Sequence, residues 1–403
     1  MKRLIGLFSL LFVAVVSAAP SLPQQGATAL SAFLKTATDR GDVPGVVVAV
    51  VNKDGTLYHE AFGVSSTLGR TPMAKDTIFN MASMTKPVTS VAIMMLVDEG
   101  KLKLDDEVAN YLPKYRNPLV ITAFKDADGT YETRPAKRPI TIRHLLTHTS
   151  GIGYGFASPT LTKIMQRTMQ SEMDVPLLFE PGESWAYGAS TRVLGNVVEV
   201  VSGQKIDAFL ESRILRPLRM VDTSYLVPPA KYPRVVAVNA RGADGTFVER
   251  PMPATLPAQV AGDGGLYGTA SDYGLFLRMI LNRGKLGDTR ILSERSAKTM
   301  FENHTGRVVV QPQQSAIPAL SRNFPLGAGK DRWGLGFQLA AEKAPNRRAS
   351  GSGTWAGIFN THFFIDPSTE IGVIVMMQTL PFYDEASMKV YAGVEEAVYR
   401  FLK

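Results

Sequence analysis

Cysteine is absent from this chain, although it has 403 residues. The protein therefore has no disulfide bonds, and thiol nucleophiles and cysteine-based metal sites are excluded. Clusters of one charge are also missing. The 44 basic and 36 acidic residues give a formal charge of +8, but they are scattered along the sequence. Proteins that bind nucleic acids gather basic residues in a patch or stripe, so we expect no nucleic-acid partner.

Long apolar runs are lacking as well, apart from a short one at the amino terminus. Lys2 and Arg3 precede an apolar run from Leu4 to Val16, and Val16-Ser17-Ala18 offers small residues for cleavage. This pattern is typical of a secretory signal peptide, and the run is too short for a comfortable membrane span. We predict a signal peptide over residues 1–18 and an exported protein, periplasmic or secreted, without stable membrane insertion after cleavage. An uncleaved anchor or a buried helix is the alternative.

No internal repeat is visible, so a solenoid or propeller is not expected. Strand patterns lie near the two ends of the sequence, and helical patterns fill the middle. The expected strands are Val46–Val51, Leu57–Phe62, Thr361–Ile365 and Ile371–Met377, with helices Ala27–Arg40 and Glu385–Leu402 outside them. The expected middle helices are Ile140–Leu146, Val193–Val201, Ile206–Leu215 and Asp272–Leu281. Two segments, Arg116–Pro139 and Gly306–Gly336, are expected to be long loops that line a cleft.

These patterns predict an α+β fold. An antiparallel sheet is flanked by the terminal helices and encloses a large inserted, mainly helical region. We expect a discontinuous sheet domain of residues 24–82 and 340–403 and a mainly helical domain of residues 83–339. Small-molecule sites commonly lie at such domain boundaries, so the active site is expected between the two domains.

Ser83 and Lys86 stand at the start of the most apolar helical stretch, which ends at Gly100. Three positions apart on a helix, their side chains share one face. A serine hydroxyl needs a neighbouring base before it can attack an acyl group, and lysine can serve when burial lowers its pKa. The alternative is a capping serine beside a surface lysine, because short motifs recur by chance.

Two further stretches could complete such a site. Tyr187 lies in a Gly-bracketed turn before a valine-rich helix, and a tyrosine beside an alkoxide could shuttle a proton. Gly351–Ile358 leads into the C-terminal strand pair, and its amides could supply oxyanion donors worth about 3 kcal/mol each. The alternatives are a packing aromatic at a turn and a Gly-rich strand edge.

Taken in this order, Ser83-x-x-Lys86, Tyr187 and Trp355-Ala356-Gly357 resemble the three active-site elements of the serine β-lactamase and penicillin-binding-protein superfamily. Ile140–Gly151 and Gly264–Tyr267 resemble that superfamily too. Within it, the sequence is most similar to the class C-like, or family VIII, carboxylesterases. The resemblance implies a β-lactamase-like fold, no metal and no cofactor.

Carried over by motif, the resemblance assigns roles to individual residues. Ser83 would be the acylated nucleophile, and Lys86 and Tyr187 would share general acid and base duty. The amides of Ser83 and Ile358 would form the oxyanion hole. The residues expected to contact the substrate are Trp355, Gly357 and Ala189.

Two of these positions depart from the class C β-lactamase pattern. Ala189 replaces an asparagine that contacts the amide side chain of the antibiotic, and Trp355 replaces a lysine that helps bind its carboxylate. Without these polar partners a charged β-lactam should bind less well, whereas an aromatic side chain favours a neutral apolar group. We therefore predict a serine hydrolase that cleaves small carboxylic esters.

Other activities remain open. The protein could be a β-lactamase or a D-amino-acid peptidase acting on β-lactams or cell-wall peptides. It could also be a non-catalytic binder that keeps the fold, although the intact Ser83, Lys86 and Tyr187 argue against this. His144 and His148 lack the glutamate of a zinc-protease motif, so we interpret them as packed or capping residues. The Gly-x-Ser-x-Gly elbow of α/β-hydrolases does not occur. The sequence leaves the oligomeric state open.

Overall fold

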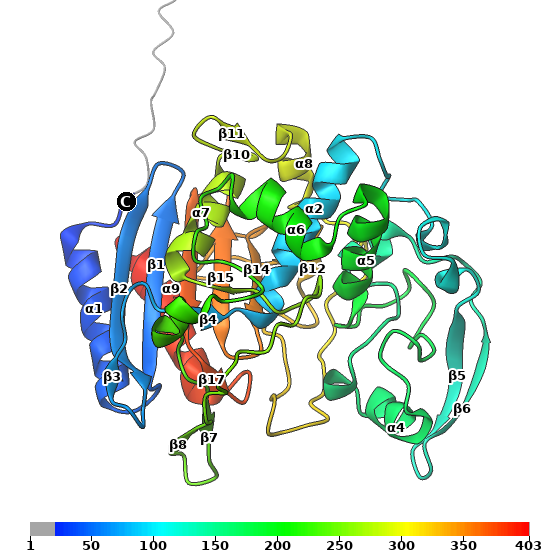
Figure 1. Ribbon diagram of the computed structural model, residues 1–403, viewed down its shortest axis with the longest axis horizontal. Coiled ribbons are helices and arrows are strands. Elements are labelled where there is room, and N and C mark those ends of the chain that lie inside the picture. Colours follow the sequence, from blue (N-terminus) through cyan, green and yellow to red (C-terminus); the bar gives the residue numbers. More distant parts are fainter. Residues whose placement is uncertain (1–20, 403) are drawn as a thin grey trace, which may run out of the picture.

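An eight-stranded antiparallel sheet forms the central layer of the computed structural model, which describes residues 21–402 (Figure 1). Across the sheet the strands follow the order β12, β13, β14, β15, β16, β1, β2 and β3. Their bounds are β1 Gly45–Asn52, β2 Thr56–Ser66, β3 Thr71–Pro72, β12 Arg332–Trp333, β13 Gln338–Leu339, β14 Gly353–Gly357, β15 Thr361–Asp366 and β16 Ile371–Met376. The predicted signal peptide lies outside the described residues. Within residues 21–402, every helix is too short or too polar to span a membrane.

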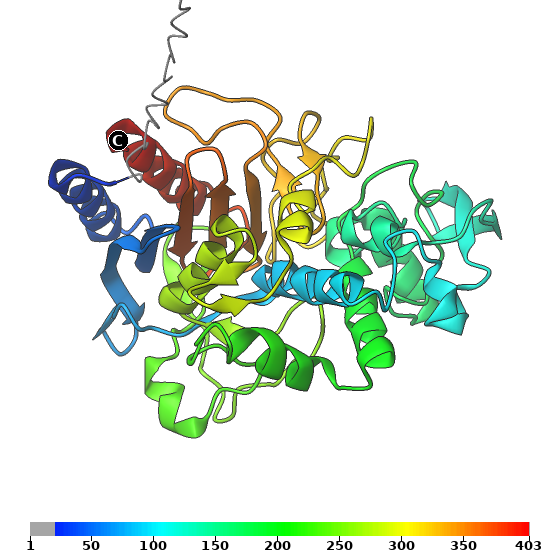
Figure 2. The same ribbon diagram turned by 90° about the horizontal axis from the view of Figure 1, so that it is seen from above.

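The two ends of the chain meet at β1, which pairs with β2 on one side and with β16 on the other. Successive side chains of a strand point to opposite faces. Val46, Val48 and Val50 pack with α1 (Gln24–Asp39) and α9 (Glu385–Phe401), whereas Val47, Ala49 and Val51 belong to the larger core on the other face. The two terminal helices lie side by side on their face of the sheet (Figure 2). Because both faces are covered, the strand is apolar throughout.

The other face of the sheet is covered by α7 (Ala270–Leu281), which packs on β1 and β16. Beside it, α2 (Thr85–Asp98) runs through the centre of the molecule (Figure 2) and contacts α5 (Ser190–Ser202) and α6 (Ile206–Leu210). All its residues from Thr85 to Leu96 are buried. This enclosure explains why the helix is mostly apolar, with Lys86, Thr89 and Ser90 among its buried polar exceptions.

The remaining helices and strands are short and surround this core. The helices are α3 Ile142–Leu146, α4 Pro159–Thr168 and α8 Glu294–Thr299. The paired strands are β4 Phe79–Asn80 with β9 Tyr267–Gly268, β5 Leu119–Lys125 with β6 Thr130–Pro135, and β10 Lys285–Leu286 with β11 Thr289–Arg290. A small sheet contains β17 Thr379–Leu380, β7 Asn239–Arg241 and β8 Phe247–Glu249.

One of the two loop predictions is wrong. Arg116–Pro139 contains the antiparallel hairpin β5–β6, whose turn includes Asp128 and Gly129 with a φ of 67°. Asp-Gly is a strong hairpin signal because glycine adopts positive φ readily. Val120 of the hairpin is buried in the large core, whereas Ile121, Phe124 and Tyr131 pack on α4. The charged residues and prolines of the segment obscured this alternation. The other loop, from Gly306, is confirmed as far as Arg332, where β12 begins.

The predicted fold class is confirmed. An antiparallel sheet carries both terminal helices on one face, and a mainly helical region is inserted between its strands. The sheet begins at Arg332, before the predicted boundary at residue 340. The division into two domains stays a prediction.

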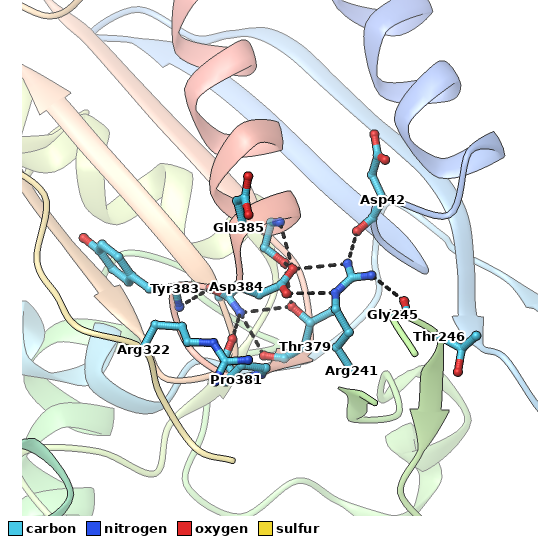
Figure 3. Close-up of polar contacts among 12 residues, drawn as sticks. Asp42, Arg241, Gly245, Thr246, Arg322, Thr379, Pro381, Tyr383, Asp384 and Glu385 are labelled. Atoms are coloured by element: carbon cyan, nitrogen blue, oxygen red, sulfur yellow. Dashed lines mark hydrogen bonds and ion pairs between the residues drawn. The ribbon is translucent and has the colours of Figure 1, made fainter. Parts of the chain in front are cut away.

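A partly buried arginine of the small sheet binds the turn before β1 and the start of α9 (Figure 3). The Arg241 guanidinium donates from Nε to Asp384 Oδ1 at 2.8 Å and from Nη2 to the Asp42 carbonyl at 2.6 Å. A third bond of 2.7 Å reaches the Gly245 carbonyl at the tip of the β7–β8 hairpin. Asp384 also caps α9 by accepting from the Ser387 amide at 3.1 Å. The Asp384 carboxylate therefore both caps α9 and pairs with Arg241.

We predict that Asp384→Ala lowers the free energy of unfolding by about 3 kcal/mol. The change removes a helix cap and leaves the partly buried Arg241 cation without its carboxylate partner. Urea denaturation of the purified protein measures the loss. Glu385→Ala is the matched control, because the Glu385 carboxylate pairs with Lys389 at an exposed position, and its denaturation midpoint should be unchanged. A loss below about 1 kcal/mol for Asp384→Ala would contradict the prediction.

Candidate active site

Ser83 lies in a tight turn between β4 and α2. The turn, Ala82–Met84, is a single 3-10 turn whose first residue has a φ of 44°. Non-glycine residues rarely adopt this conformation, which costs about 1 kcal/mol. The Asn80 side chain holds the turn by accepting from the Ala82 amide at 3.0 Å. The serine is thus presented at the amino-terminal end of a rigid, buried helix.

Lys86 lies on the next turn of the helix and is 2% exposed. Its Nζ donates to Ser83 Oγ at 3.1 Å, to the Asp263 carbonyl at 2.8 Å and to Tyr154 Oη at 3.2 Å. A buried ammonium is costly unless its hydrogens have acceptors. Here all three hydrogens have one, and one of the three acceptors is the candidate nucleophile.

Tyr187 comes from the turn before α5 and reaches the same serine. Its Oη lies 2.6 Å from Ser83 Oγ, and its ring centroid lies 4.8 Å from Lys86 Nζ. The Trp355 indole donates to Tyr187 Oη at 3.4 Å, and the two rings pack with centroids 4.8 Å apart. The structure therefore brings together the three predicted catalytic residues, which lie on two separate segments of the chain.

The end of β14 packs closely against the turn that carries Ser83. A Cβ on Gly357 would lie 2.3 Å from the Met81 carbonyl, a distance at which only glycine fits. This contact brings Ile358, the next residue, beside the turn that carries Ser83. Ala189 is fully buried at the start of α5. The substrate contacts of Trp355, Gly357 and Ala189 stay predictions.

Sequence reasoning missed three polar residues behind Lys86. Tyr154 donates to the Asp263 carboxylate, and Arg192 Nε donates to Asp263 Oδ1 at 3.0 Å. Burial, and then the negative charge of Asp263, raise the pKa of Tyr154 well above its ordinary value, so its phenol stays protonated. The available signals were a tyrosine between glycines and an aspartate directly before Gly264-Gly265. Neither pattern points to Lys86.

The two histidines have the structural roles that the sequence predicted. His144 forms a capping box with Thr141 at the start of α3. His148 packs against Trp185, Tyr187 and Trp333. Burial lowers the pKa of His148 well below its ordinary value, with Lys86 adding to the effect, so the imidazole is neutral.

Comparisons with known proteins agree with this geometry. The beta-lactamase family profile matches residues 30–396. The chain is 31% identical over 369 residues to Protein Rv1367c of Mycobacterium tuberculosis, covering 87% of this chain and 89% of that protein. It is 28% identical over 375 residues to lovastatin esterase of Penicillium rubens, with coverages of 86% and 92%. The solved structure of unliganded simvastatin synthase from Aspergillus terreus has a TM-score of 0.80 and 25% identity, covering 94% of this chain and 98% of that one.

A serine beside a buried lysine and a tyrosine, on this antiparallel sheet and central helix, defines a serine hydrolase of the β-lactamase-like fold. The family match spans most of the sequence, and the chain belongs to the beta-lactamase family. The predicted superfamily and the prediction of a serine hydrolase are both confirmed.

We predict that Tyr187→Phe lowers kcat for a p-nitrophenyl ester by about a hundredfold or more, because it deletes the hydroxyl that contacts Ser83. KM should change little, since the phenyl ring still packs on Trp355. Steady-state kinetics measure both constants, and an unchanged melting temperature shows that the fold is intact. A loss of less than about threefold in kcat would rule out Tyr187 as an essential acid or base.

Proposed function

We propose that the protein hydrolyses carboxylic esters through an acyl-enzyme on Ser83. The observation that carries the proposal is the position of Ser83 Oγ, within hydrogen-bond distance of both Lys86 Nζ and Tyr187 Oη. A nucleophile held between two proton-transfer groups suits acyl transfer. The named activity of lovastatin esterase, a relative over most of this chain, supports an ester as substrate.

In the proposed acylation, Ser83 Oγ attacks the ester carbonyl carbon, and its proton passes to the Lys86–Tyr187 pair. The carbonyl oxygen becomes an oxyanion held by the amides of Ser83 and Ile358. When the tetrahedral intermediate collapses, the carbon–oxygen bond to the alcohol breaks, and Tyr187 returns a proton to the leaving oxygen. A water molecule then attacks the acyl-enzyme, and the same groups act in reverse to release the acid and restore Ser83.

The surroundings of Trp355 favour a neutral substrate. Its indole packs against the rings of Tyr187, Trp333 and Trp185. This aromatic cluster is apolar at the position where the related β-lactamases would place a cation. It therefore provides no positive charge to bind a substrate carboxylate. Hydrolysis of β-lactams or cell-wall peptides is the second candidate, and it is supported by the family match.

An apolar groove of about 240 Å³ begins beside the Ser83 turn, and we propose that it holds the acyl chain. Asn80 and Phe359 line the groove and lie within three residues of Ser83 and Ile358, the proposed oxyanion amides. Val236, Val238, Met252 and Leu256 form its apolar surface. The leaving alcohol must face Tyr187, on the side of Trp355, so the groove is left for the acyl part. The proposed substrates are therefore esters of apolar acids.

We also propose that the protein is exported and that water, rather than a second alcohol, is the usual acceptor. Export is supported by the basic start and short apolar run of residues 1–18. The mass of the mature protein from periplasmic and culture-medium fractions tests it. A protein of full-length mass confined to the cytoplasm would overturn the export proposal. The name of one relative, monacolin J acid methylbutanoyltransferase, supports acyl transfer as the alternative to hydrolysis, and product analysis with added alcohols decides between the two acceptors.

Comparing ester and β-lactam substrates tests the reaction. We expect hydrolysis of p-nitrophenyl butanoate at a kcat/KM at least about a hundredfold above that for a chromogenic cephalosporin, because Trp355 and Ala189 lack the polar partners of a β-lactam. Ser83→Ala should abolish both activities. Full ester activity in Ser83→Ala would disprove the acyl-enzyme, and a cephalosporin rate that matched the best ester would favour the second candidate.

Filling the groove tests where the acyl chain lies. Val238→Trp should lower kcat/KM about tenfold for long-chain p-nitrophenyl esters and leave acetate unchanged, because the larger ring takes the space of several methylenes. Leu119→Trp, which fills a different groove beside Tyr115, is the matched control. If Val238→Trp instead discriminated among butanoate esters of longer alcohols, the groove would hold the alcohol part.

A further inference from the structure

Besides Ser83, two residues hold the amine of Lys86, and neither of them touches Ser83. Two of the three hydrogen bonds from Lys86 Nζ end on Tyr154 Oη and on the Asp263 carbonyl. Only the third ends on Ser83. A lysine side chain has four rotatable bonds, so its direction must be fixed by its acceptors. Tyr154 and Asp263 leave the amine a single direction in which to exchange a proton.

Tyr154 can act as an acceptor for Lys86 because its own hydrogen is engaged elsewhere. Its hydroxyl donates to the Asp263 carboxylate, which is 2% exposed. The oxygen lone pairs are thereby left for Lys86. Arg192 holds the same carboxylate through Nε at 3.0 Å, and Glu172 lies 3.8 Å from the Arg192 guanidinium. Asp263 therefore orients the phenol and stays paired with a cation.

The backbone before Asp263 packs closely between α2 and α5. Thr89 Oγ1, on α2 one turn after Lys86, donates to the Gly262 carbonyl at 2.6 Å. A Cβ on Gly262 would lie 2.5 Å from the Thr191 carbonyl and 2.8 Å from the Gly195 Cα of α5. Only glycine allows this contact. The Asp263 carbonyl cannot move away from Lys86 unless α2 and α5 separate.

We propose that Tyr154, Asp263 and Arg192 are positioning residues that aim the Lys86 amine at Ser83. In its charged form Lys86 uses all three hydrogens on Tyr154, Asp263 and Ser83. In its neutral form it keeps two for Tyr154 and Asp263 and turns its lone pair toward the Ser83 hydroxyl. The amine thus takes up and releases the serine proton without breaking a hydrogen bond. The inference rests on the proposed function of Ser83 and Lys86.

A p-nitrophenyl phosphonate tests the inference, because it measures Ser83 reactivity without later steps. Ser83 Oγ attacks phosphorus, the bond to the aryl oxygen breaks, the serine proton passes to the Lys86–Tyr187 pair, and p-nitrophenolate leaves. The amount of p-nitrophenolate released gives the number of intact active sites, and the rate of release measures the reactivity of Ser83. Tyr154→Phe should lower the rate roughly tenfold to a hundredfold while the amplitude stays stoichiometric.

Two further comparisons separate positioning from stability. Arg192→Gln should lower the rate, and Arg192→Lys should recover much of it, because a cation again holds Asp263. Tyr111→Phe is the matched control, since Tyr111 Oη donates to the Asp106 carboxylate at 2.7 Å in a bond of the same kind. Its rate and amplitude should equal those of the wild type.

The outcomes are distinct. A Tyr154→Phe rate within about twofold of the wild type, or a loss confined to the amplitude, overturns the positioning role. If Ser83→Ala releases p-nitrophenolate as fast as the wild type, the proposed function itself fails. If Ser83→Ala is inert and Tyr154→Phe is unaffected, only the inference of positioning fails.

Discussion

The buried amine of Lys86 is the constraint on which the site depends. A cation can be kept away from water only where acceptors replace its solvation, and three segments of the chain supply them. The acceptors are the hydroxyl of Ser83, which lies in a strained turn, the hydroxyl of Tyr154 and the carbonyl of Asp263. The acceptors that compensate for burying the Lys86 charge therefore also fix the position of its amine relative to the Ser83 hydroxyl.

The sequence predicts the parts of the site whose signals are local. Ser83 and Lys86 share a helix face, and Tyr187 and Trp355 stand in short motifs with a known order. The acceptors behind Lys86 carry no local signal, since Tyr154 lies 68 residues from Lys86 and Asp263 lies 177. Their contacts arise only when the chain folds, because spacing along a sequence does not encode distances across a core.

The fold shows the same division. The apolar runs of β1, β15 and β16 predict a sheet covered on both faces, and that sheet forms. The hairpin β5–β6 was missed because its few packed residues, Val120 in the large core and Ile121, Phe124 and Tyr131 on α4, lie among exposed and charged ones. An irregularity between Ile121 and Ala123 breaks the alternation of the strand, and the composition of the segment is typical of loops. The order of strands across the sheet was also beyond reach, since strand pairing is decided by long-range packing.

The pairing of β1 with β16 sets the order in which the protein can be completed. β1 (Gly45–Asn52) is made long before its partner β16 (Ile371–Met376). Until then, the edge of β1 that pairs with β16 is bare, and the face that packs on α1 still lacks α9. Exposed edges and apolar faces of this kind promote aggregation in incomplete chains. The sheet is therefore complete only once Ile371–Met376 has been made, and products truncated before Ile371 lack the strand that joins β1 to β15.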